Sequence, residues 1–163
     1  SMIVGGPNKY YDYNEKLIDE IFKKVYKNFI KNGYQLIFIP SLRTPSKIIE
    51  KAKKYFSSDE IIINNVDKKA YLCALKLAKY IIVTCDSTSM ISEAAMTGKP
   101  IYVAQMEPIR QNKRFKSFFK LFKSLNIIKD FDNTIEDWHY ERLNETDKIS
   151  SYIKDQIKDY DFS

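Results

Sequence analysis

Short runs of uninterrupted apolar residues alternate along this chain with longer segments in which apolar residues recur every three or four positions. The apolar runs occupy residues 3–4, 36–39, 61–63, 81–84 and 101–104. Runs of this length without polar alternation are typical of strands that are covered on both faces. The patterns together predict an α/β domain, in which helices cover both sides of a parallel sheet.

The segments between the strands have the periodicity of helices. The expected helices cover residues 13–31, 44–56, 70–79 and the segment from the hydroxyl cluster at 87–89 to Gly98. In the second of these, Thr44 is expected to be the cap and Pro45 the first helical residue. With strands numbered in chain order, we expect the sheet order 3-2-1-4-5, with about five or six strands in all.

The composition fits one domain over residues 1–163. The chain has 163 residues, of which 44% are hydrophobic, enough for one sizeable core. An apolar run of about 18 residues would be needed to span a membrane, and neither such a run nor a signal-peptide pattern is present, so a soluble, cytoplasmic domain is expected. The spacing of Cys73 and Cys85 does not suggest zinc, and buried free thiols are expected.

The formal net charge of +6 favours anionic ligands in general and selects none of them. Part of this charge lies in the basic, aromatic segment 112–123. Its phenylalanines recur at helical spacing, so we expect them to pack on the core with lysines on the opposite face. Docking of this segment on a membrane surface is the alternative. Nucleic-acid binding is not expected, because no recognised module accompanies the charge.

The small hydroxyl residues after the strand at 81–84 predict an anion site. They open a helix, whose first N–H groups and positive dipole end attract a phosphate or diphosphate. Glu93 lies about one and a half turns further along, where its carboxylate can accept hydrogen bonds from sugar hydroxyls. The simpler interpretation is that residues 86–88 only cap the helix and that Glu93 is an ordinary exposed residue.

The expected strand order brings further residues to the same place, because ligands of open α/β sheets bind where the order reverses. Here that point lies between the first and fourth strands. The residues predicted to contact a ligand are Gly5, Gly6, Pro7, Arg43, Asp86, Ser87, Thr88, Ser89, Glu93 and Arg114. The glycine pair could instead form a plain turn, and Arg43 a surface ion pair.

No residue is assigned a catalytic role, and no metal site is predicted. His139 is the single histidine and is expected to be structural. The loop aspartates Asp130, Asp132 and Asp137 lack the glycine of a calcium loop and a paired histidine.

Several segments, in order along nearly the whole chain, resemble the mitochondrial fission "elongated mitochondria" family, whose bacterial members are often labelled predicted nucleoside-diphosphate-sugar epimerases. The segments are Gly5-Gly6-Pro7-Asn8-Lys9-Tyr10, Ser41-Leu42-Arg43-Thr44-Pro45, residues 83–94, Thr97-Gly98-Lys99-Pro100, Arg114-Phe115, and Trp138-His139-Tyr140 with Asn144-Glu145-Thr146. The chain departs from the family at Lys69-Ala70-Tyr71, where members tend to have Asn-Pro-Tyr. Only Tyr71 carries over, in a loop that lies near the nucleobase in related folds.

The resemblance implies a Rossmann-like domain of the type found in the C-terminal half of GT-B glycosyltransferases. In such proteins two domains hold a nucleotide sugar between them, and the glutamate corresponding to Glu93 usually binds the donor ribose. The resemblance therefore implies a nucleoside diphosphate or nucleotide sugar as ligand, no required cofactor or metal, and a missing N-terminal domain that supplies the general base. The alternative is a non-catalytic adaptor with a vestigial nucleotide site, as the family's role in organelle division suggests.

Overall fold

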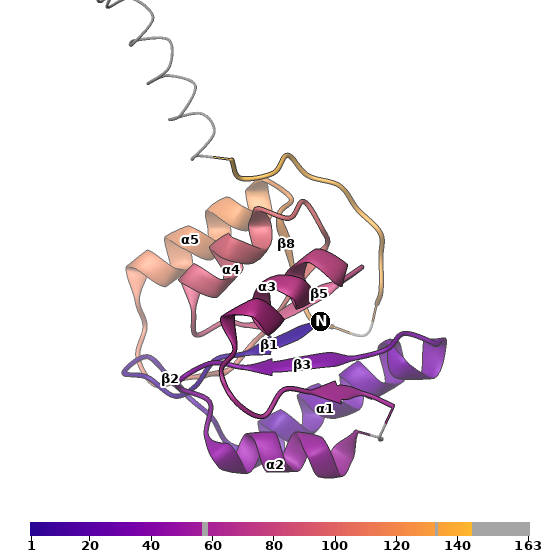
Figure 1. Ribbon diagram of the computed structural model, residues 1–163. Coiled ribbons are helices and arrows are strands. Elements are labelled where there is room, and N and C mark those ends of the chain that lie inside the picture. Colours follow the sequence, from indigo (N-terminus) through magenta and orange to yellow (C-terminus); the bar gives the residue numbers. More distant parts are fainter. Residues whose placement is uncertain (57–58, 133, 145–163) are drawn as a thin grey trace, which may run out of the picture.

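A six-stranded parallel sheet forms the centre of the computed structural model, which describes residues 1–56, 59–132 and 134–144 (Figure 1). The sheet order is β4-β3-β1-β5-β6-β8. The strands are β1 (Met2–Val4), β3 (Ile37–Pro40), β4 (Ile61–Ile62), β5 (Ile81–Thr84), β6 (Ile101–Ala104) and β8 (Ile128–Asp130). In the register of the central strands, Ile3 lies opposite Ile39 on one side and Val83 on the other.

Helices cover both faces of this sheet (Figure 1). On one face lie α1 (Glu15–Asn28), which is followed by the short 3-10 helix η1 (Ile30–Asn32), and α2 (Ser46–Tyr55). On the other face lie α3 (Lys68–Leu77), α4 (Thr88–Ala95) and α5 (Lys113–Ser124). The structure is thus a three-layer, Rossmann-like α/β domain, as expected.

A small antiparallel ribbon stands apart from the main sheet. It pairs β2 (Tyr11–Asp12) with β7 (Glu107–Pro108) and so joins the loops that follow β1 and β6. The rings of Tyr10 and Tyr11 both pack against Phe115 of α5, at centroid distances of 5.5 and 5.3 Å. The ribbon thereby fixes the loop after β1 against α5.

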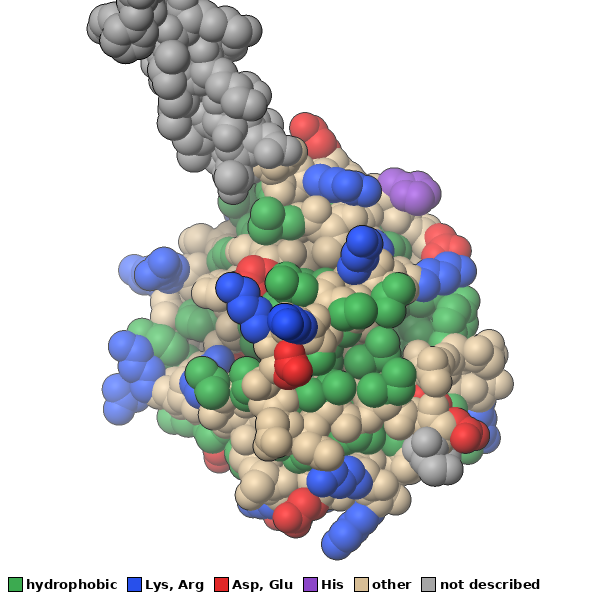
Figure 2. Space-filling model, viewed as in Figure 1, with side chains coloured by type: hydrophobic (Ala, Val, Ile, Leu, Met, Phe, Trp, Pro, Cys, Tyr) green, Lys and Arg blue, Asp and Glu red, His purple; other side chains and the backbone are tan. Residues whose placement is uncertain are grey.

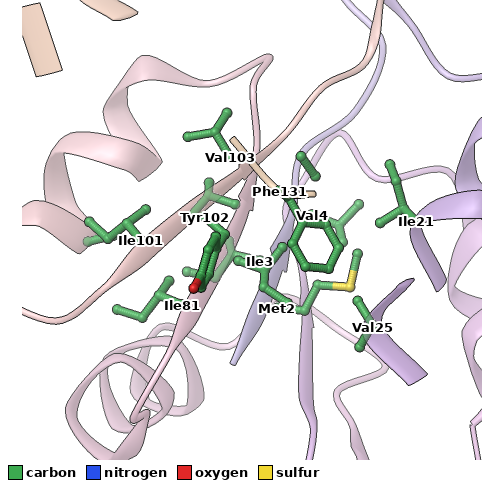
Figure 3. Close-up of a cluster of buried hydrophobic side chains, with 14 of the residues drawn as sticks. Met2, Ile3, Val4, Ile21, Val25, Ile81, Ile101, Tyr102, Val103 and Phe131 are labelled. Atoms are coloured by element: carbon green, nitrogen blue, oxygen red, sulfur yellow. The ribbon is translucent and has the colours of Figure 1, made fainter. Parts of the chain in front are cut away.

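The core fills the spaces on both sides of the central strands, as the cluster in Figure 3 illustrates. Met2 and Val4 of β1 lie near Val25 and Ile21 of α1, while Tyr102 of β6 packs its ring against Phe131. Every residue of β1, β5 and β6 is buried. This burial on both faces explains why these strands appear in the sequence as uninterrupted apolar runs.

The expected strand order is confirmed, with β8 added at the end beyond the fifth predicted strand. The start expected for the second helix is wrong. Pro45 is the N-cap and Ser46 the first helical residue, because the Thr44 hydroxyl bonds to the carbonyl oxygens of Val4 and Gly5 instead of capping the helix. The expectation of two buried thiols is also wrong, since Cys85 is buried and Cys73 is exposed.

Within the described residues, no helix is long and apolar enough to cross a bilayer. The segment 134–144 runs along the outside of the domain as extended chain and inserts Trp138 against Tyr102 at a centroid distance of 5.1 Å. Glu145 and Thr146, which belong to the last of the segments that resemble the family, lie outside the described residues.

Candidate functional site

The loops that follow β1 and β5 are bonded directly to each other at the carboxyl edge of the sheet. The Gly5 N–H donates to Thr84 Oγ1 at 2.8 Å, and the Gly6 N–H donates to Asp86 Oδ2 at 3.1 Å. The Asn8 side chain adds a bond from Nδ2 to the Asp86 carbonyl oxygen at 3.1 Å. Segments about 80 residues apart in the sequence therefore meet at the point where the strand order reverses, as predicted.

The Asp86 carboxylate is the centre of this junction. It is buried and accepts hydrogen bonds from the Gly6 N–H, from Arg43 Nη2 at 2.8 Å and from the Tyr13 hydroxyl. Burial, followed by the neighbouring Asp86 charge, raises the pKa of Tyr13, so the phenol stays protonated and acts as a donor. A buried charge with three donors is well satisfied, and here it holds the loops after β1, β3 and β5 together.

Arg43 reaches this junction from the loop after β3. Its Nη1 donates to the Gly6 carbonyl oxygen at 2.8 Å, while Nη2 forms the ion pair with Asp86. The side chain is nevertheless 40% exposed. Protein groups therefore anchor Arg43 at its terminal nitrogens. The rest of its side chain lines a cavity together with Leu42 and Val66.

A cavity of about 480 Å³ opens beside the first two turns of α4. Ser87 is the N-cap, and its Oγ accepts from the Met90 N–H at 3.4 Å. Arg114 faces the cavity from the first turn of α5, whose N-cap Asn112 accepts from the Arg114 N–H at 2.8 Å. The cavity is lined by Thr88, Ser89, Ser92, Glu93, Arg114 and Phe118. This is the arrangement of hydroxyls, helix N-terminus and guanidinium that suits a phosphate group.

A second and more apolar cavity, of about 540 Å³, lies between the N-terminal ends of α3 and α4 and the ends of β1 and β3. Its apolar walls come from Ile3, Ile39, Pro40, Leu42, Val66 and Met90. Ser87 and Glu93 also line it, so Glu93 belongs to both cavities. The Tyr71 hydroxyl donates to Glu93 Oε2 at 2.5 Å across this space.

The structure divides the ten predicted residues into two groups. Gly5, Gly6, Asp86 and Arg43 form the internal junction, with exposed Pro7 beside them, and Arg43 also lines the apolar cavity. Ser87, Thr88, Ser89, Glu93 and Arg114 line open cavities. Sequence reasoning missed Ser92 and the hydrogen bond between Tyr71 and Glu93. This bond depends on the contact between α3 and α4, which nothing in the sequence of either helix alone indicates.

Among the residues that the structure describes, no group of three or more histidine, cysteine, aspartate or glutamate side chains could hold a metal ion. His139 is exposed in the extended segment after β8, next to the buried Trp138. It does not line either of the two cavities described above.

Comparison with known proteins decides the family. The family model described as "Mitochondrial fission ELM1" matches residues 1–157 of this chain. The chain belongs to the mitochondrial fission ELM1 family. The resemblance predicted from the sequence motifs is thereby confirmed.

Two relatives of this ELM1-family chain are informative. The chain is 32% identical to "Uncharacterized protein RP120" of Rickettsia prowazekii over 97% of its own length and 46% of that protein. It is 28% identical to "Mitochondrial fission protein ELM1" of Arabidopsis thaliana, over 72% of its own length and 28% of that protein. The chain thus spans less than half the length of either relative.

Proposed function

We propose that this domain binds the nucleoside diphosphate part of a nucleotide sugar and serves glycosyl transfer as one half of a GT-B-type protein. One observation carries the proposal. The Glu93 carboxylate stands between an apolar cavity and a cavity lined by hydroxyls and Arg114. A nucleoside diphosphate has the same sequence of properties. Its base is largely apolar, its ribose carries hydroxyls, and its diphosphate is anionic.

The diphosphate would lie at the N-terminus of α4. The hydroxyls of Thr88 and Ser89 can donate to phosphate oxygens there, and the helix contributes its positive end. Arg114 lines the same cavity and adds a full positive charge. These groups would also stabilise the diphosphate as it departs during sugar transfer, a form of catalysis that works by electrostatic complementarity to developing charge.

The ribose would bind Glu93, whose carboxylate accepts hydrogen bonds from neighbouring hydroxyls. The base would then enter the apolar cavity, beside Met90 and Val66. In this arrangement Gly5, Gly6 and Asp86 hold the loops in place, because their polar groups already bond to one another. Arg43 would contribute its exposed part to the wall of the base cavity.

The test is the affinity of purified domain for UDP, GDP, ADP and CDP, measured by ligand-detected NMR in wild type and two variants. Glu93→Ala and Arg114→Gln should each weaken binding of the preferred nucleotide about tenfold, the change expected for losing one good polar contact. Glu50→Ala is the matched control, since Glu50 is an exposed glutamate of α2 on the opposite face of the sheet. Equal affinity in all four proteins would contradict the proposal.

A second candidate is an adaptor domain that works through protein contacts. It is favoured by exposed apolar side chains on α3, where Leu72 and Leu77 are 54% and 69% exposed. Figure 2, which has the same view as Figure 1, shows several hydrophobic side chains exposed near the middle of the molecule, in the region where Figure 1 places α3. The Arabidopsis relative is named for mitochondrial fission. A folded wild-type domain that binds none of the four nucleotides, even at tens of millimolar, would favour this candidate.

A further inference from the structure

We propose that Tyr71 is a positioning residue that holds the Glu93 carboxylate ready to receive the hydroxyls of a ribose. This inference rests on the proposed function and extends it to a residue on a different helix. The hydrogen bond from the Tyr71 hydroxyl to Glu93 Oε2, at 2.5 Å, is the observation behind it.

The position of Tyr71 is fixed by its own helix. Asp67 caps α3, its Oδ1 accepting from the N–H groups of Lys69 at 2.7 Å and Ala70 at 3.0 Å. Tyr71 follows directly in the first turn, and its half-buried ring packs against the hydrophobic core. The ring is therefore held firmly while its hydroxyl reaches the cavity that Glu93 also lines.

Glu93, in contrast, is exposed on α4 and has three rotatable side-chain bonds. Without a partner, such a side chain loses rotamer freedom when a ligand binds, and this loss weakens binding. Tyr71 removes part of that freedom before the ligand arrives. Because it bonds to Oε2, it leaves Oε1 as an acceptor for a ligand hydroxyl.

The protonation state of Tyr71 supports the same role. Burial, and then the hydrogen bond to Glu93, raises the pKa of Tyr71 above its ordinary value. The phenol is therefore protonated throughout the neutral range and can donate to the Glu93 carboxylate. A permanent donor is what a fixed orientation of Glu93 requires.

Tyr71→Phe tests the inference, because it removes the hydroxyl and keeps the ring. Affinity for the preferred nucleotide among UDP, GDP, ADP and CDP should fall about fivefold, the effect expected from restoring the freedom of one long side chain. Tyr80→Phe is the matched control. It removes a similar bond, from the Tyr80 hydroxyl to Asp137 Oδ1 at 2.6 Å, next to the start of β5 at the other edge of the sheet.

The decisive comparison repeats Tyr71→Phe in the Glu93→Ala background. If Tyr71 acts through Glu93, the second substitution should change affinity less than twofold there, whereas a merely structural defect would weaken binding in both backgrounds. Binding that depends on Glu93 yet is unchanged by Tyr71→Phe would overturn the positioning role alone. An equal loss in both backgrounds, or an equal loss in Tyr80→Phe, would also overturn it. If the wild type binds no nucleotide, the proposed function fails as well.

Discussion

Two glycines at the carboxyl edge of the sheet allow the loop after β1 to approach its neighbours closely. A Cβ atom on Gly5 would overlap the Asp86 carboxylate, and one on Gly6 would overlap the backbone carbonyl of Arg43. The sequence predicts a tight turn or a phosphate contact from such a pair. It does not predict this packing, because the opposing groups come from loops about 40 and 80 residues away.

Gly6→Ala should therefore destabilise the domain strongly. The new methyl group meets backbone that has no freedom to rotate away, so we expect a loss of about 3 kcal/mol, at the upper end for overpacked sites. Gly33→Ala is the control, since Gly33 has φ 82° and open space around it, and should lose only about 1 kcal/mol. Urea unfolding of both variants measures the difference, and equal losses would contradict this view of Gly6.

Tyr13→Phe tests the buried junction around Asp86. The substitution removes one of the donors to a buried carboxylate, which should cost about 1–3 kcal/mol of unfolding free energy. Tyr26→Phe, at an exposed tyrosine of α1, should cost less than about 0.5 kcal/mol. Both values come from urea unfolding monitored by circular dichroism. A Tyr13→Phe protein as stable as wild type would mean that the remaining donors satisfy Asp86.

The two cysteines should differ in reactivity and in pH dependence. Burial raises the pKa of the Cys85 thiol from 9.0 to about 11, whereas Cys73 is exposed. At pH 8, iodoacetamide should therefore label Cys73 alone in the folded protein, as mass spectrometry would show. The buried site favours the protonated thiol over the thiolate. The contribution of Cys85 to the free energy of unfolding is therefore complete below pH 9 and is lost as the pH rises towards 11. Labelling of Cys85 at pH 8 would contradict its burial.

Helices with strong periodicity and strands with continuous apolar runs were predictable from the sequence, whereas very short strands and the exact starts of two helices were not. In α5 three of the four phenylalanines pack on the core as expected, with Phe122 buried and Phe118 and Phe119 partly buried, whereas Phe115 packs against Tyr10 and Tyr11. The strands β2 and β7 have two residues each, and β8 contains the polar pair Lys129-Asp130, so none of them shows a strand pattern. Their pairing depends on partners that are distant in the sequence.

The start of α3 is an element boundary that the sequence pattern placed too late. We expected the helix from Ala70, but it begins at Lys68 because Asp67 caps it. Asp67→Ala should cost about 1 kcal/mol of stability through loss of the cap. Asp67→Asn should retain most of that stability, because asparagine is also a good cap. Thermal unfolding compares the two, and equal losses would argue against capping as the source.

At the scale of the whole molecule, the order of the sheet and the convergence of its loops follow from the same argument. Alternating strands and helices predicted the order β4-β3-β1-β5-β6, and the reversal between β1 and β5 predicted where loops converge. The sequence did not reveal that these loops would bond to one another through Asp86 and leave two separate cavities around Glu93. That division depends on side-chain packing between helices.

The most direct test of the account is a titration of ¹⁵N-labelled wild-type domain with UDP, GDP, ADP and CDP, followed by amide chemical shifts. We expect saturable shifts for one nucleotide, with a dissociation constant of about 1 mM, concentrated at Thr88, Ser89, Glu93, Arg114 and Tyr71. Shifts confined to the exposed lysines of α5, or no saturable shift at tens of millimolar, would contradict nucleotide binding at this site.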